Sequence, residues 1–103
     1  MRAQKYLERG SEQFSKGQLE QAVDSLKRAY ELDPQNSMIK SSLTLFLGEN
    51  ANRDFREGRL EEALKHAELL YSILPEDPDV LRLHNSILQA LGKQTVNSPK
   101  ETP

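Results

Sequence analysis

The two histidines are the residues best suited to metal binding or acid–base chemistry in this chain. His66 and His84 are far apart in the sequence and are expected on different helices. A helical metal site places its ligands a few residues apart on one face, so two imidazoles with this separation do not form such a motif. We therefore predict no metal site and interpret both rings as surface or packing residues.

Patterns for nucleophilic catalysis or phosphate binding are also missing. No serine lies in a Gly-x-Ser-x-Gly motif, the five glycines form no phosphate loop, and the chain has no cysteine. The carboxylates at 61–62 and 76–79 are expected to be solvated or to cap helix starts. We therefore predict no catalytic residues and no cofactor, and we expect that the protein is not an enzyme.

Composition narrows the class of protein further. The chain has 103 residues, of which 36% are apolar and 29% charged, and its net charge is −2. Proteins that bind nucleic acid or anionic lipid usually carry an excess of basic residues, so neither partner is expected. The N-terminal residues show no signal-peptide pattern, and the richest apolar stretch, 43–47, is too short to span a membrane. We expect one small cytoplasmic domain.

An internal repeat organises the sequence. Seven identities recur at a single offset, the one that separates Phe14 from Phe55, and chance coincidence would not place so many in one register. The pairs are Phe14/Phe55, Gly17/Gly58, Leu19/Leu60, Glu20/Glu61, Ala22/Ala63, Tyr30/Tyr71 and Pro34/Pro75.

Each copy has the apolar spacing of a helix, a glycine turn and a second helix. In the first copy, one helix is expected to end at 14 and the next to cover 19–32. In the second copy, the return helix is expected to cover 60–74. A fifth helix begins at Asp77-Pro78, a typical N-cap followed by proline, and ends at Gly92. Residues 93–103 lack apolar content and are expected to be a disordered tail or linker.

These positions resemble the tetratricopeptide repeat (TPR), a helix–turn–helix unit that is shorter than the offset between the two copies. The resemblance implies an all-α, right-handed α-solenoid of about two and a half repeats and five helices, covering residues 3–92. A repeat at 3–36, a second at 44–77 and a closing helix at 78–92 place the family's preferred small residues and prolines at Gly10, Gly17, Ala22, Ala29, Pro34, Ala51, Gly58, Ala63 and Pro75, with Leu70 in place of one alanine.

The offset between the two copies is seven residues longer than one TPR unit. We therefore infer that segment 37–43 is inserted between the copies. Seven residues are almost two helical turns and displace the apolar face by only about 20°. The insertion can therefore lengthen the third helix to 37–57. The alternative is a break at Gly48, but a single glycine costs a helix only about 1 kcal/mol, so we favour the continuous helix.

The resemblance further implies a concave groove that binds a peptide or helix of a partner protein. Its positions in this sequence are Leu7, Ser11, Phe14, Ser15, Leu45, Gly48, Asn52, Phe55, Arg56, Arg82, Ser86 and Gln89. Phe14 and Phe55 could anchor an apolar partner side chain, or they could complete the core between helices. Some family members bind chaperone C-terminal carboxylates through a cationic clamp, but the clamp positions here hold no cation: Leu7, Ser11, Glu49, Asp79 and Leu83.

The segment around the insertion suggests a second hypothesis. Its apolar side chains point in more directions than one neighbouring helix can cover, and its small residues permit the backbone of another helix to approach closely. A homodimer formed through the third helix would use Met38, Ser41, Ser42, Leu45, Phe46 and Gly48. Packing within the monomer is the alternative. The sequence thus predicts a non-catalytic protein-interaction module, with a structural self-association role as the other possibility.

Overall fold

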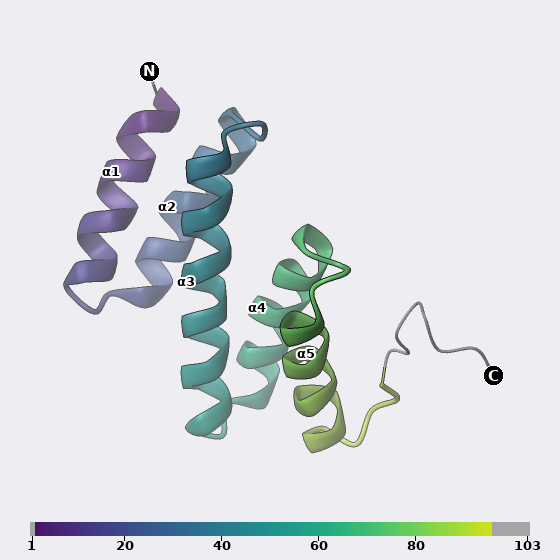
Figure 1. The fold of residues 1–103 in the computed structure, drawn as a ribbon. Coiled ribbons are helices and arrows are strands. Elements are labelled where there is room, and N and C mark those ends of the chain that lie inside the picture. The colour runs from purple at the N-terminus through teal and green to yellow at the C-terminus, as the bar shows by residue number, and fades with distance from the viewer. Residues whose placement is uncertain (1, 96–103) are drawn as a thin grey trace. The chain divides into compact units, whose positions relative to one another are not determined.

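A computed structural model describes residues 2–95, and within that range the chain is all-helical (Figure 1). The five predicted helices are present and the described residues contain no strand. They are α1 (Arg2–Ser15), α2 (Leu19–Leu32), α3 (Ser37–Arg56), α4 (Leu60–Ile73) and α5 (Pro78–Ala90).

The helices form two compact units, one up to Glu49 and one from Asn50 onward. α3 runs from the first into the second as a single helix of 20 residues. It passes through Gly48 without a break, so the continuous helix that the sequence favoured is the one observed. We call the two parts unit 1 and unit 2.

Unit 1 is built on a close contact between α1 and α2 at Gly10. A β-carbon on Gly10 would clash with a methyl group of Leu26 and lie 3.2 Å from the carbonyl oxygen of Ala22. Leu26 and Ala22 are both fully buried. The two helices therefore pack backbone against side chain at this point.

Unit 2 has its own apolar core, formed by the end of α3 with α4 and α5. Small residues of α3 and α4 meet larger ones of α4 and α5, and three partly buried side chains close the edge. The core residues are Ala51, Ala63, Leu64, Ala67, Ile87 and Leu88, with Phe55, Leu83 and Leu91 packed against them.

One turn geometry recurs after α1, α3 and α5. Gly17 and Gly58 both have φ 79°, and Gly92 has φ 73°. The residue after each glycine donates its N–H to the carbonyl five residues back, at 2.9, 2.8 and 2.8 Å. This pattern is a Schellman motif, whose left-handed residue is usually glycine because a β-carbon is strained there. The repeated glycines of the sequence therefore adopt the same backbone conformation in the structure.

The starts of α3 and α5 also match. Asn36 Oδ1 accepts from the N–H groups of Met38 and Ile39, at 3.0 and 3.1 Å, and Asp77 Oδ1 accepts from those of Asp79 and Val80, at 2.9 and 3.2 Å. The two cap residues are separated by the same offset as the identities in the sequence. Between equivalent caps and turns α3 has 20 residues and α5 has 13, so α3 is longer by seven.

The C-terminal segment is described only in part. Lys93 to Thr95 have no regular secondary structure. The rest of the tail predicted to be disordered, 96–103, lies outside the described residues.

Candidate functional site

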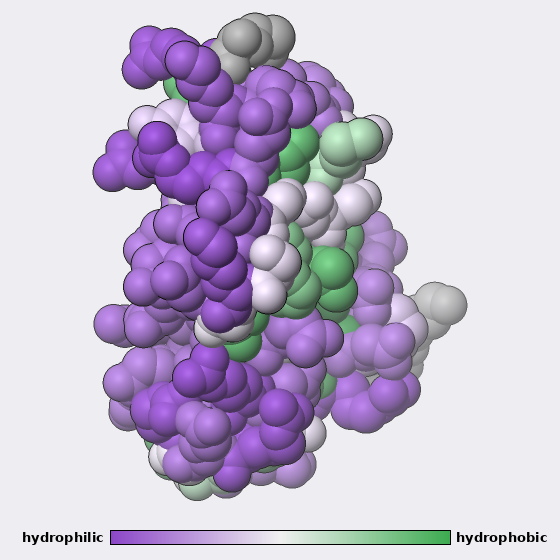
Figure 2. Space-filling model, turned by 90° about the vertical axis from the view of Figure 1, so that its left-hand side faces the viewer, coloured by the Kyte–Doolittle hydropathy of each residue, from purple (hydrophilic) through white to green (hydrophobic). Residues whose placement is uncertain are grey.

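The most apolar exposed surface in unit 1 lies on α3. Met38 is 65% exposed and Leu45 is 53% exposed, and they are seven residues apart, which places them two turns apart on one face of the helix. Ser41 lies between them and is also exposed. We call Met38, Ser41 and Leu45 the α3 face. Figure 2 shows that some hydrophobic surface is exposed among mostly hydrophilic side chains.

The opposite side of the same stretch is buried. Ile39, Leu43 and Leu47 are fully buried. The first twelve residues of α3 include one charged side chain, that of Lys40, although 29% of the whole chain is charged. This part of α3 therefore has hydrophobic side chains on its exposed face as well as on its buried face. It has more apolar surface than its packing within unit 1 requires.

Two of the predicted binding residues in unit 1 contribute to its packing. Leu7 is buried on α1. The Phe14 ring is half-buried and stacks on the Phe46 ring, with centroids 4.2 Å apart and planes 8° apart. Phe46 itself is buried, so this residue of the self-association set does not reach the surface. Ser11 and Ser15 are exposed, and Ser42 and Gly48 are half-buried.

The predicted groove residues of unit 2 are mainly polar and near the surface. Phe55 is half-buried against the core of the unit. The Arg82 guanidinium lies 2.9 Å from Asp79 in an exposed ion pair. The remaining groove residues of this unit have polar side chains. Three of them are exposed, namely Asn52, Arg56 and Gln89, and Ser86 is half-buried.

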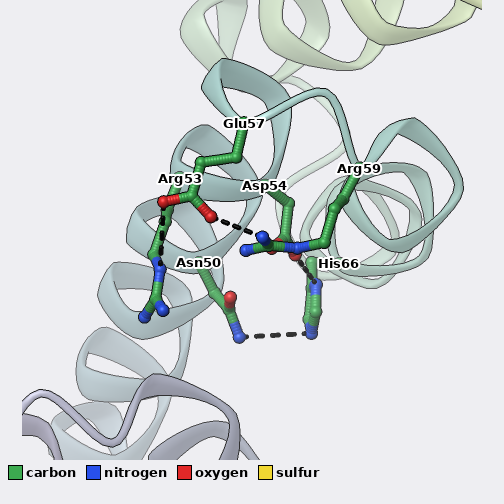
Figure 3. A network of polar contacts seen from close by, with 6 residues as sticks. All are labelled: Asn50, Arg53, Asp54, Glu57, Arg59 and His66. Carbon is green, nitrogen blue, oxygen red and sulfur yellow. Dashed lines mark hydrogen bonds and ion pairs between the residues drawn. The ribbon is translucent and has the colours of Figure 1, made fainter.

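A buried carboxylate in unit 2 is a feature that the sequence analysis missed (Figure 3). Asp54 is 4% exposed, and its Oδ1 accepts from Arg59 Nε at 3.0 Å and from Nη2 at 2.6 Å. Arg59 follows the Gly58 turn, so the ion pair ties the end of α3 to the start of α4. Hydrogen bonds to Asp54 and to Glu57 raise the pKa of the Arg59 guanidinium.

His66 extends this cluster from α4. Its Nδ1 lies 3.3 Å from Asp54 Oδ2, close enough for an ion pair but not directed as a hydrogen bond. Its Nε2 lies 3.3 Å from Asn50 Nδ2. Because an amide nitrogen only donates, Nε2 accepts, and the proton of a neutral ring lies on Nδ1, the side of Asp54. These polar contacts link α3 to α4.

The equivalent positions in unit 1 hold a simpler contact. Ser25 Oγ donates to Gln13 Oε1 at 2.7 Å. The repeat offset relates Gln13 to Asp54 and Ser25 to His66. Both hairpins therefore have a polar link at the same place, which is neutral in unit 1 and charged in unit 2. The repeat offset would have pointed to this pair.

His84 has a different environment from His66. It is 5% exposed, and its ring stacks on Tyr71 with centroids 5.0 Å apart and planes 10° apart. Neither ring nitrogen has a hydrogen-bond partner among the described residues. Burial lowers the pKa of His84, and the charge of Glu68 opposes this in part. The imidazole packs as a neutral aromatic ring, the packing role that the sequence suggested.

None of the described helices is both long and apolar enough to cross a lipid bilayer. Within 2–95, no group of three or more acidic or histidine side chains is arranged to hold a metal ion. Comparison with protein-family models, with curated proteins and with solved structures found no match to this chain.

Proposed function

We propose that this protein is a non-catalytic interaction module that binds a helix or peptide of a partner protein, with the α3 face at the centre of the contact. The observation that carries the proposal is the exposure of Met38 and Leu45 on a helix segment with one charge in twelve residues. Large apolar side chains at such a surface gain most when a partner removes them from water.

The family assignment belongs to the same proposal. Seven identities at one offset, matching glycine turns and matching caps support an array of TPR-like hairpins. We propose a right-handed α-solenoid for the complete arrangement, in which first helices of successive repeats line a groove. Leu45 belongs to that groove in the family pattern, and its 53% exposure is in keeping with such a role.

Self-association through α3 is the second candidate function. Its support is the same pair of exposed side chains, because a two-fold axis near the α3 face would place each helix against its own copy. The buried Phe46 takes no part in it. The two functions differ in particle mass, which a homodimer doubles and a partner-binding monomer does not.

The test uses a double variant, Met38→Glu with Leu45→Glu. Both side chains are exposed, so unfolding stability is expected to change by no more than about 0.5 kcal/mol. Leu32→Glu is the matched control, because Leu32 is also a large apolar residue, 46% exposed, but lies at the end of α2. Light scattering gives the particle mass, and affinity capture followed by mass spectrometry identifies bound proteins.

Partner binding predicts that the wild-type chain and Leu32→Glu capture the same proteins and that the double variant loses them, with one chain per particle throughout. Self-association predicts two chains per particle for the wild type and one for the double variant. Unchanged capture and unchanged mass in the double variant would refute both functions for the α3 face.

A further inference from the structure

Unit 1 has a polar hollow between α1 and α2, lined by none of the residues of the α3 face. Its volume is about 460 Å³. Two guanidinium groups approach one aromatic ring there, with Arg9 5.4 Å and Arg28 6.0 Å from the centroid of the Tyr6 ring. Amide and hydroxyl groups complete the lining, which consists of Tyr6, Arg9, Gln13, Gln21, Asp24, Ser25 and Arg28.

Neither arginine has an acidic partner in the part of the chain that the structure describes. Among those residues, no carboxylate lies within 4.0 Å of a nitrogen of Arg9 or Arg28. Asp24 is the one acid in the lining, and although it lies one turn before Arg28 it makes no ion pair with it. The Tyr6 ring holds both guanidinium groups near the hollow through cation–π attraction while leaving their N–H donors unused by carboxylates.

The repeat offset allows the lining residue Gln13 to be compared with the equivalent residue of unit 2. In unit 2 the residue equivalent to Gln13 is Asp54, whose carboxylate accepts two hydrogen bonds from one guanidinium. In unit 1 the Gln13 amide replaces that carboxylate, and its Oε1 accepts from Ser25. The residue equivalent to Arg59 is Gln18, so unit 1 has neither charge of that cluster, and Arg9 and Arg28 are guanidinium groups without such an anion.

We propose that the hollow binds the carboxylate side chain of an acidic segment of a partner polypeptide. A planar carboxylate matches the forked donors of arginine and can accept two parallel N–H bonds from one guanidinium. A volume of about 460 Å³ suits one or two side chains rather than a folded element. Such binding does not depend on the α3 face, so each site can fail without the other.

The direct test is a titration of the ¹⁵N-labelled chain followed by NMR. The probe is a capped tetraglutamate peptide, and tetraglutamine is its uncharged counterpart. We expect saturable shifts of the amides near Tyr6, Arg9 and Arg28 with the glutamate peptide at low salt, and none with the glutamine peptide. The shifts should weaken as salt rises, because the contact is electrostatic and exposed.

Paired variants make the test specific to the hollow. Arg9→Gln with Arg28→Gln should weaken binding about tenfold or more, since each removes a charge-assisted contact. Lys5→Gln with Lys27→Gln removes the same charge from the same two helices at exposed positions outside the lining, and should have a smaller effect.

Asp24→Asn should act in the opposite direction. Removing the one acid of the lining takes away repulsion of the ligand, so affinity is expected to rise roughly two- to fivefold. Each variant is first checked by its circular dichroism spectrum and unfolding midpoint, which the exposed positions should leave almost unchanged.

Three results would overturn the proposal. One is equal binding of the glutamine peptide. Another is an equal loss of binding in the lysine and arginine double variants, which would show a general charge effect. The third is binding of inorganic phosphate alone at the same amides as tightly as the glutamate peptide, which would make the hollow a free-anion site.

Discussion

Replacing Gly10 by alanine tests the contact on which unit 1 is built. The new methyl group would meet the buried Leu26 side chain and would lie 3.2 Å from both the Ala22 carbonyl oxygen and the Ser25 β-carbon. The neighbours on α2 have little room to move, because Ala22 and Leu26 are fully buried and Ser25 is nearly so. Gly10→Ala is therefore expected to force the two helices apart.

The magnitude follows from two opposing effects. Overpacking a well-packed core costs about 1–3 kcal/mol. Alanine in place of glycine inside a helix contributes about 0.5–1 kcal/mol in the other direction. We expect a net loss of about 1 kcal/mol in unfolding free energy, which corresponds to a fall in Tm of roughly 4–8 °C for a domain of this size.

Urea and thermal unfolding followed by circular dichroism measure the change. The control is the neighbouring exposed Ser11, where the difference between Ser11→Ala and Ser11→Gly gives the helix-propensity effect alone. If Gly10→Ala is more stable than the wild type by about that difference, then α1 and α2 do not touch at this point and the reasoning is wrong.

Three further predictions concern the caps and the histidines. Asn36→Ala and Asp77→Ala should each cost about 1 kcal/mol of unfolding free energy, because each removes a side chain that accepts from two backbone N–H groups; exposed Glu76→Ala should cost little. Stability should fall as the pH drops below 6.5, because the lowered pKa of folded His84 means that the unfolded chain binds the proton more readily, and His84→Gln should remove that part of the slope in acid titrations. A neutral His66 should hold its proton on Nδ1, readable from ring ¹⁵N chemical shifts, and an Nε2–H form would contradict the contact with Asn50.

The helices and their turns could be predicted because their signals are local. A glycine that follows an apolar stripe ends a helix through its own backbone freedom, and Gly17 and Gly58 do so with the same φ. The continuity of α3 through Gly48 could also be predicted, since one glycine costs less than breaking a helix. The cap at Asn36 was missed because a Pro-Gln-Asn stretch is equally typical of a loop.

The buried polar groups could not be predicted in the same way. A carboxylate in a sequence is normally interpreted as solvated, but Asp54 is buried with Arg59 folded back to it from beyond the turn. Phe14 could equally have been exposed or packed, because its environment depends on Phe46, which is distant in the sequence and lies on another helix. The pairing of Arg9 and Arg28 over Tyr6 likewise needs two helices placed side by side.

The most direct test of the central claim observes Met38 itself. The chain has two methionines, so labelling their methyl groups with ¹³C gives two signals, and Met1 serves as the internal reference. If the α3 face binds another protein, the Met38 signal should broaden or shift in a cell extract, or with rising chain concentration if the partner is a second copy, and Leu45→Glu should restore the free signal. A Met38 signal that changes under neither condition, or that changes equally in the Leu45→Glu variant, would contradict the account.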